Sequence, residues 1–395
     1  MDTALVNARV LTDNEVVRGK AVLIQDGRIA AIVDGAAAPR HFIRHDLGGG
    51  LLVPGFIDTQ VNGGGGVLFN DAPSVDSIAA IGAAHRRFGT TGFLPTLIST
   101  DIETLEAAVA ATREAMAAGV PGLLGVHIEG PFLSAKRKGI HDASKFRVID
   151  EAAFRLLTSL GPGRTMLTLA PETTSPEMIR RLTDGGVIVA AGHTNAAYAT
   201  IRTALDYGLR GFTHLFNAMS PLTSREPGAV GAALEDQASW CGLIVDGKHV
   251  DPVVLRIALR AKRLDKFMLV TDAMPSVGAA EKSFRLQGRL VTVQNGVCVD
   301  ENGTLAGSDL DMAAAVRNAM GLLDLELPDA VHMASRNPAA FLGLDRELGR
   351  IAPGYRADMV LLDDDLQVTE TWIGGVDSHA AAPAQTPRLG RPSHG

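Results

Sequence analysis

Eight short and almost uniformly apolar segments alternate with helical stretches through the middle of the chain. They are residues 53–58, 92–97, 123–129, 166–172, 187–193, 211–215, 243–247 and 267–272. Runs that are apolar on both faces are typical of parallel strands buried between helices. Eight such alternations predict an α/β fold, the (β/α)8 TIM barrel, and a doubly wound open sheet is the alternative.

Both ends of the chain differ from the middle in their sequence pattern. Residues 1–53 and 346–378 are rich in short strand-like segments, so we expect a small β-sandwich domain built from both termini. The barrel would occupy residues 54–345. Alternating residues and Asn-Gly turns predict a β insertion at about residues 280–306, at the barrel mouth. Residues 379–395 are rich in Ala, Pro and Gly and are expected to form a disordered tail.

Length and charge limit the classes of function. The 395 residues suit a barrel of about 250 residues with a smaller module. A net charge of −7 argues against nucleic-acid and anionic-membrane partners. The sequence has no apolar run of the ~18–20 residues that a membrane span needs, and no signal-peptide pattern. Cys241 and Cys298 lack a paired metal spacing, so we expect reduced thiols and a cytoplasmic protein.

Ionisable residues stand at or just beyond the ends of the predicted strands. These residues are Asp58, Glu129, Glu172, His193, His214, Asp246 and Asp272. Active sites of TIM barrels lie at the C-terminal ends of the strands. Any one of these side chains alone is explained equally well as a hydrogen-bonded core group or a capping carboxylate. Their repetition on one face favours a functional site, because buried ionisable groups are costly unless they are paired or bind metal.

Four of these side chains form a chemically coherent set. Glu129, His193 and His214 offer one carboxylate and two imidazoles, the donor set of a catalytic zinc-type site. A divalent ion there would activate water. Asp272 would then take a proton from that water. The sequence therefore predicts metal-assisted hydrolysis.

Several motifs resemble a known group of hydrolases. They are PGFID (54–58), HIEGPF (127–132), GHT (192–194), THLFNAM (213–219), TDAM (271–274) and IAPGYRADMVLLD (351–363). The set resembles the amidohydrolase superfamily and, within it, is similar to the N-acetylglucosamine-6-phosphate deacetylase family. The resemblance extends to about residue 375. PGFID and the C-terminal motif are widespread in the superfamily, whereas HIEGPF and THLFNAM are much more specific.

The resemblance implies an activity and its requirements. The expected reaction is metal-dependent hydrolysis of the N-acetyl group of N-acetyl-D-glucosamine 6-phosphate to D-glucosamine 6-phosphate and acetate, in amino-sugar catabolism and recycling. The expected cofactor is one divalent metal per subunit, with zinc ahead of iron, manganese or cobalt. The expected partners are a phosphorylated amino sugar and a second copy of the chain in a homodimer.

The same resemblance implies roles for individual residues. Glu129, His193 and His214 match the family's metal ligands, and Asp272 matches its catalytic acid/base. His141 matches a catalytic residue that contacts the substrate near the acetyl carbonyl. The remaining implied substrate-binding residues are Ile140, Asn217, Ala218, Arg225, His249, Leu305, Ala306 and Gly307.

One position departs from the wider superfamily. Many members have His-x-His after the first barrel strand, where it helps to hold a second metal, whereas this chain has Gln60 and Asn62. Amides are poor zinc ligands next to imidazole, so we predict one tightly bound metal, with Gln60 and Asn62 as polar residues of a weak second site. The alternatives are an amidohydrolase for another acylated amino sugar or cyclic amide, and a non-catalytic scaffold with this fold.

Overall fold

The eight predicted barrel strands form one parallel sheet in the computed structural model, which describes residues 2–379. In sheet order the strands are β6 (Phe56–Val61), β9 (Thr90–Ile98), β10 (Gly125–Glu129), β11 (Arg164–Leu169), β12 (Ile188–Ala191), β13 (Gly211–Phe212), β14 (Trp240–Leu243) and β15 (Phe267–Leu269). The first and last strands meet beyond β15, where Val61 bridges Ala273 and the Asp272 N–H donates to the Gln60 carbonyl at 3.0 Å. The predicted TIM barrel is confirmed.

The seventh strand lies earlier in the chain than predicted. The prediction was residues 243–247, but β14 spans Trp240–Leu243, so the two share only Leu243. Beyond the strand, the Asp246 carboxylate accepts hydrogen bonds from the N–H groups of Lys248 and His249, at 2.8 and 2.9 Å. This side-chain turn takes the place of strand pairing at these residues. Ile244 and Val245, which precede it, are buried although they lie in a loop and not in a strand.

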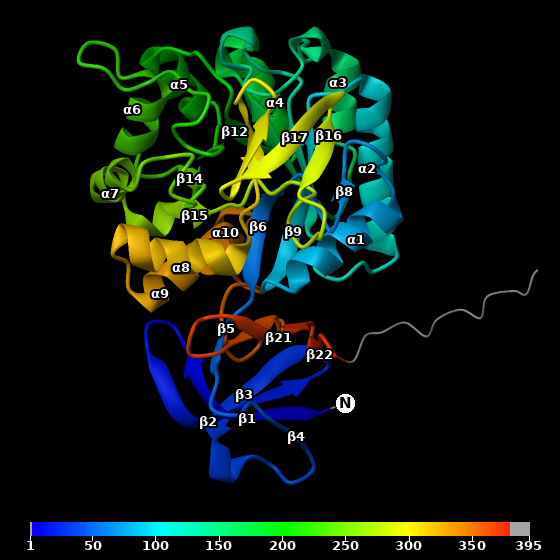
Figure 1. The fold of residues 1–395 in the computed structure, drawn as a ribbon, viewed down its shortest axis with the longest axis vertical. Coiled ribbons are helices and arrows are strands. Elements are labelled where there is room, and N and C mark those ends of the chain that lie inside the picture. The colour runs from blue at the N-terminus through cyan, green and yellow to red at the C-terminus, as the bar shows by residue number, and fades with distance from the viewer. Residues whose placement is uncertain (1, 380–395) are drawn as a thin grey trace, which may run out of the picture.

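Helices surround the barrel on its outside (Figure 1). They are α1 (Val75–Arg86), α2 (Ile102–Ala117), α3 (Glu151–Leu157), α4 (Pro176–Asp184), α5 (Tyr198–Asp206), α6 (Gly228–Glu235), α7 (Pro252–Ala261), α8 (Met312–Leu323), α9 (Leu327–Ala334) and α10 (Arg336–Phe341). Side-chain caps start several of them, such as Ser74 on α1 and Asp311 on α8. Within residues 2–379, none of the helices combines the length and apolarity that crossing a bilayer requires.

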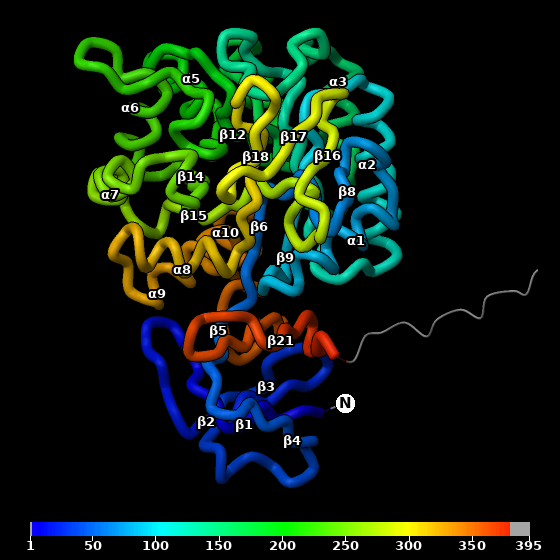
Figure 2. The backbone as a smooth tube through the Cα atoms, in the orientation of Figure 1, coloured from blue at the N-terminus to red at the C-terminus, as the bar shows by residue number. Residues whose placement is uncertain are grey.

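Strands from both ends of the chain make a second, separate sheet below the barrel (Figures 1 and 2). Its strands are β1 (Thr3–Leu11), β2 (Val16–Gln25), β3 (Arg28–Asp34), β4 (Ile43–Asp46), β5 (Leu51–Pro54), β20 (Met359–Leu362), β21 (Val368–Ile373) and β22 (Val376–Asp377). The order is β22-β21-β20-β5-β1-β2-β3, and β4 also pairs with β1. Leu5, Val22, Met359 and Trp372 belong to its buried core. Only Gly55 separates β5 from β6.

A four-stranded antiparallel sheet lies in front of the barrel after the eighth strand (Figure 1). Its strands are β16 (Ser283–Leu286), β17 (Arg289–Gln294), β18 (Val297–Asp300) and β19 (Leu305–Ser308). The Ser308 N–H donates to the Asp272 carbonyl at 2.9 Å, which ties β19 to the end of the last barrel strand. Of the expected tail at 379–395, all but His379 lies outside the described residues.

Candidate metal centre and active site

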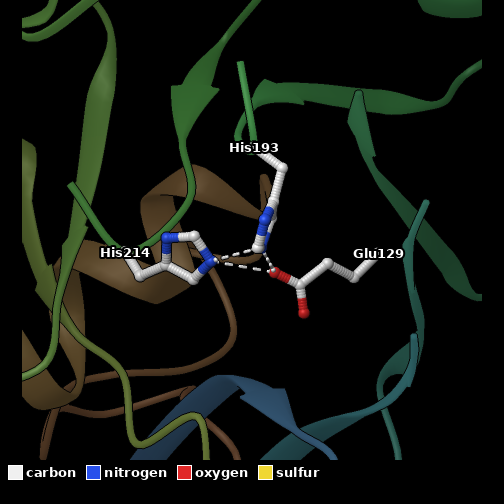
Figure 3. A group of neighbouring side chains, drawn as sticks. All are labelled: Glu129, His193 and His214. Atoms are coloured by element: carbon white, nitrogen blue, oxygen red, sulfur yellow. Dashed lines mark hydrogen bonds and ion pairs between the residues drawn. The ribbon is translucent and has the colours of Figure 1, made fainter. Parts of the chain in front are cut away.

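Three side chains from the ends of three barrel strands converge on one point (Figure 3). Glu129 ends β10, and His193 and His214 each lie two residues beyond β12 and β13. Glu129 Oε1 lies 3.0 Å from His214 Nε2 and 3.3 Å from His193 Nε2. The two Nε2 atoms are 3.1 Å apart, and all three residues are buried. One carboxylate and two imidazoles are thereby brought within reach of a single ion.

The protonation of His193 fits a metal ligand. Its Nδ1 lies 2.9 Å from the carbonyl oxygen of Arg137, which only accepts hydrogen bonds. Nδ1 is therefore the donor to this carbonyl, and Nε2 is the ring atom that faces Glu129 and His214, where a metal would bind it. Two ring nitrogens facing each other at 3.1 Å do not both hold protons. This N2O donor set, within which the atoms lie no more than 4.8 Å apart, fits a divalent cation.

Glu129 is held in its ionised form. Burial alone would raise its pKa, but the neighbouring imidazoles of His193 and His214 bring the pKa well below the usual value. Gln60 adds an amide donor, because its Nε2 lies 3.2 Å from each Glu129 oxygen. The carboxylate is therefore available as a charged ligand.

Asp272 lies beside this group and has a different environment. Its Oδ1 accepts hydrogen bonds from Asn62 Nδ2 at 2.6 Å and from Gln60 Nε2 at 3.1 Å. Burial, followed by the negative charge of Glu129, raises the pKa of Asp272 to about 6. A carboxyl group with a pKa near neutrality can both accept and return a proton, which is the requirement for general acid/base catalysis.

His141 presents a hydrogen-bond donor to the same site. Its Nδ1 accepts the backbone N–H of Ser99 at 3.3 Å and lies 2.8 Å from the Ser99 hydroxyl. Burial and then the neighbouring His193 hold the pKa of His141 well below its usual range, so the ring is neutral. A neutral ring that accepts at Nδ1 has its proton on Nε2. His141 is thus suited to donate to a substrate oxygen.

Three of these residues have backbones in the left-handed region. The φ angles are 46° at His193, 34° at His214 and 52° at Asp272. Such angles are uncommon for residues other than glycine and are maintained only where surrounding structure imposes them. The sequence folds locally into sharp turns at these strand ends, which direct the side chains inward across the barrel mouth.

A cavity of about 270 Å³ opens above the group. The sequence-predicted residues that line it are Glu129, Ile140, His141, His193, His214, Asn217, Ala218, His249, Asp272, Leu305 and Gly307. Gln60 and Asn62 lie behind Asp272, and Ala306 is buried beside the lining. Arg225 is exposed on the loop at 220–227 and is not brought to the cavity. Among the described lining residues there is no lysine or arginine.

Two supporting residues, Asp246 and Ser99, had no role assigned to them from the sequence. Asp246 Oδ2 lies 2.6 Å from His249 Nδ1, which fixes the His249 ring at the cavity edge. Ser99, immediately after β9, fixes His141 in the same way. Both lie at or just beyond the end of a barrel strand. The preference of active sites for strand ends, which predicted the other residues, therefore also points to these two. Their roles are indirect, and strand position alone does not reveal which imidazole each one contacts.

Comparison with known proteins agrees with this geometry. Residues 51–377 match the model of the amidohydrolase family, and residues 3–52 match that of the NagA composite domain. Because the first match covers most of the chain, the protein belongs to the amidohydrolase family. The expected family membership is confirmed.

More specific relatives are deacetylases of phosphorylated amino sugars. The chain is 44% identical to an N-acetylgalactosamine-6-phosphate deacetylase of Shewanella sp. (strain ANA-3), over 93% of this chain and 94% of the relative. The crystal structure of an N-acetylglucosamine-6-phosphate deacetylase from Pasteurella multocida has a TM-score of 0.92 at 36% identity, covering 96% and 100% of the two chains. A Mycobacterium smegmatis mutant enzyme in complex with N-acetyl-D-glucosamine-6-phosphate has a TM-score of 0.87 at 37% identity, covering 95% and 99%.

Proposed function

We propose that the protein hydrolyses the N-acetyl group of N-acetyl-D-glucosamine 6-phosphate, giving D-glucosamine 6-phosphate and acetate. The observation that carries this proposal is the convergence of Glu129, His193 and His214 beside Asp272 and His141, in one cavity of an amidohydrolase barrel. The names of its relatives, deacetylases acting on N-acetylhexosamine 6-phosphates, support the substrate class.

Two residues of the chain handle protons and charge in this reaction. His141 donates from Nε2 to the acetyl oxygen and stabilises the negative charge that develops there. Asp272 accepts a proton from the attacking water, and later gives that proton to the leaving amine, so that amide and water become amine and acetate. Support for this second role comes from the raised pKa of Asp272, about 6.

Glu129, His193 and His214 would hold the divalent metal that the family uses. When bound, such an ion supplies Lewis acidity, which activates water and polarises a carbonyl. We assign zinc first, because an N2O set suits it, while iron, manganese or cobalt can occupy the same donors. One metal per subunit follows from Gln60 and Asn62, whose amide groups donate to Glu129 and Asp272 instead of offering lone pairs there.

The phosphate group would occupy the side of the cavity near His249, Asn217 and Ala218. A dianion favours a cationic partner, yet the described lining contains no lysine or arginine. Arg225, exposed on its loop, is available to a neighbouring copy of the chain. We therefore propose a homodimer in which this arginine completes the phosphate site. The free, buried thiols of Cys241 and Cys298 are compatible with a cytoplasmic location.

N-Acetyl-D-galactosamine 6-phosphate is the second candidate substrate. The Shewanella relative named for this sugar is 44% identical, compared with 36% and 37% for the two structures named for the glucosamine compound. The two sugars differ only in the configuration of one hydroxyl group, so the acetamide chemistry is the same for both. The ratio of kcat/KM values decides between them.

A single assay tests these assignments. Acetate release is followed from both 6-phosphates and from plain N-acetylglucosamine, with metal content measured on the same sample. We expect turnover of a phosphorylated sugar, little with the plain sugar, and about one metal per chain at the barrel site. The Asp272→Asn variant should bind substrate and lose turnover by several orders of magnitude. Near-normal turnover in that variant rejects the mechanism, and inactivity of the wild type on both phosphates rejects the substrate class.

A further inference from the structure

A second group of ionisable side chains lies in the small β domain, away from the barrel. Nitrogen of His45 and carboxylate oxygens of Glu370 and Asp377 all lie within 4.8 Å of one another. The three residues come from β4, β21 and β22, so strands from opposite ends of the chain contribute. We propose that this group is a second divalent-cation site, formed by one imidazole and two carboxylates.

Strand register explains why the two acidic side chains share a face. Asp377 pairs directly with Trp372 across β21 and β22, and opposite residues of an antiparallel pair point to the same side. Glu370 precedes Trp372 by two residues and therefore points to that side as well. His45 reaches them from β4, with its ring 5.7 Å from the Trp372 ring and its Nε2 3.1 Å from Glu370 Oε2.

Glu370 provides an independent indication of a ligand. Its side chain is only 7% exposed, and its Oε1 is buried without a hydrogen-bond partner within the described residues. A buried carboxylate oxygen without a partner is costly, because that oxygen has lost its hydrogen bonds to water and has no protein hydrogen bond to replace them. The imidazole of His45, with its Nε2 at 3.1 Å, satisfies Oε2 alone. A cation beside the carboxylate would also compensate the second oxygen.

The charges of this group favour a cation as well. Two carboxylates face one imidazole, and burial together with the charge of Asp377 raises the pKa of Glu370. The imidazole of His379 also acts electrostatically on Glu370, and the backbone N–H of His379 donates to Asp377 Oδ1 at 2.9 Å. Arg86 is the neighbouring cation. Its guanidinium donates to the Thr371 hydroxyl and carbonyl and to the Val376 carbonyl, and it experiences the charge of Asp377.

The donor set and its access define the class of ion. Imidazole favours zinc-like metals over magnesium and calcium, and two carboxylates are acceptable to both. Zinc bonds of about 2.0–2.2 Å place tetrahedral ligand atoms about 3.4 Å apart, so small rotations of the side chains suffice. His45 is 33% exposed, which opens a path from solvent. The bound ion would join the N-terminal and C-terminal strands, and its role would be structural.

The test counts metals in full-length protein stripped with a chelator and dialysed against zinc. We expect about two equivalents in the wild type and one in Glu370→Gln, which keeps the size of the side chain. A barrel variant, His214→Asn, should also hold one, and combining it with Glu370→Gln should leave none. Asp364→Asn removes an exposed carboxylate of the same domain and should leave two.

A second measurement separates binding from misfolding. In the His214→Asn background, zinc should raise Tm by several degrees and magnesium should not, and Glu370→Gln should abolish the zinc effect. If the wild type holds one equivalent and His214→Asn none, or if Glu370→Gln still holds two, the proposal is wrong. The metal bound in the β domain is counted in variants that lack the barrel site. The test therefore remains valid even if the barrel site binds no metal.

Discussion

Gln60 joins Glu129 and Asp272 through a single amide group. Its Nε2 lies 3.2 Å from both Glu129 oxygens and 3.1 Å from Asp272 Oδ1. Asn62 adds a second donor to the same Asp272 oxygen at 2.6 Å. The first-strand amides therefore orient the proposed ligand and the proposed acid/base relative to each other. This is a positive role for residues that, from sequence, were notable for not being histidines.

Replacing Gln60 by Leu should lower kcat about 10–100-fold, because hydrogen bonds to charged groups contribute about 1.5–3 kcal/mol. KM should change little, and the metal content should stay near one in the barrel, because Leu removes a donor and no ligand. Gln25→Leu, at an exposed position, is the control. Loss of metal with unchanged turnover per metal would show that Gln60 supports the ligands and not the acid/base.

Gly307 should not tolerate a side chain. Its φ is +64°, and a Cβ there would lie 2.6 Å from Met274 Cε and 2.7 Å from the Asp272 carbonyl oxygen. Gly307→Ala should therefore displace the end of the last barrel strand and reduce kcat/KM by at least tenfold. Gly303→Ala is the matched control, since its φ is +76° but nothing lies within 4 Å. Both variants incur backbone strain of about 1–2 kcal/mol, and only Gly307→Ala adds a steric clash, so a larger Tm loss and a loss of activity are expected at Gly307 alone.

His85 should make the fold sensitive to acid. It is fully buried, its Nε2 lies 2.8 Å from the Gly63 carbonyl, and burial lowers its pKa to about 4. The unfolded chain has a histidine pKa of about 6.5 and binds more protons below that value. Stability should therefore fall as pH drops from about 6.5 towards 4, by about 1.4 kcal/mol per unit for this group.

Thermal unfolding between pH 7 and pH 4 measures that slope. His85→Gln keeps a donor for the Gly63 carbonyl and removes the titrating ring, so its Tm should fall less steeply with acid. His41→Gln, at an exposed histidine, should keep the wild-type slope. Equal slopes in all three proteins would assign the acid sensitivity to other groups.

Thr271 should be needed to keep Asp58 in the core. Its hydroxyl donates to Asp58 Oδ2, and burial raises the pKa of this carboxyl group to about 7. Thr271→Val leaves a buried oxygen without its donor, which should cost about 1–3 kcal/mol of stability. Because Thr271 directly precedes Asp272, kcat should fall too. Urea unfolding and steady-state kinetics measure both effects, and Thr203→Val, at an exposed position of α5, should change neither by much.

The barrel and its central residues were accessible from sequence for a physical reason. Parallel strands buried on both faces produce apolar runs, and their C-terminal ends collect the polar residues of the site. Glu129, His193 and His214 follow from these two facts, and the structure brings them together. The seventh strand was misplaced because residues 243–245 are as apolar as a strand, and the Asp246 turn that excludes pairing has no periodic signature.

The proposed cation site of the small β domain could not be predicted by this reasoning. His45, Glu370 and Asp377 lie at unremarkable positions, two of them more than three hundred residues from the first. Their proximity depends on which strands pair across the ends of the chain, and alternation within one strand does not specify its neighbour. The position of Arg225 likewise depends on the fold. Only the structure shows that its loop is exposed and does not line the cavity.

The connection through Gly55 has a consequence for synthesis. β5 continues directly into the first barrel strand, and its own sheet partner β20 lies near the other end of the chain. On the ribosome, β5 emerges long before β20, so one of its edges stays uncovered while the barrel assembles. The domain that begins the polypeptide is thus completed last. Nascent chains lacking β20 would expose that edge beside the barrel.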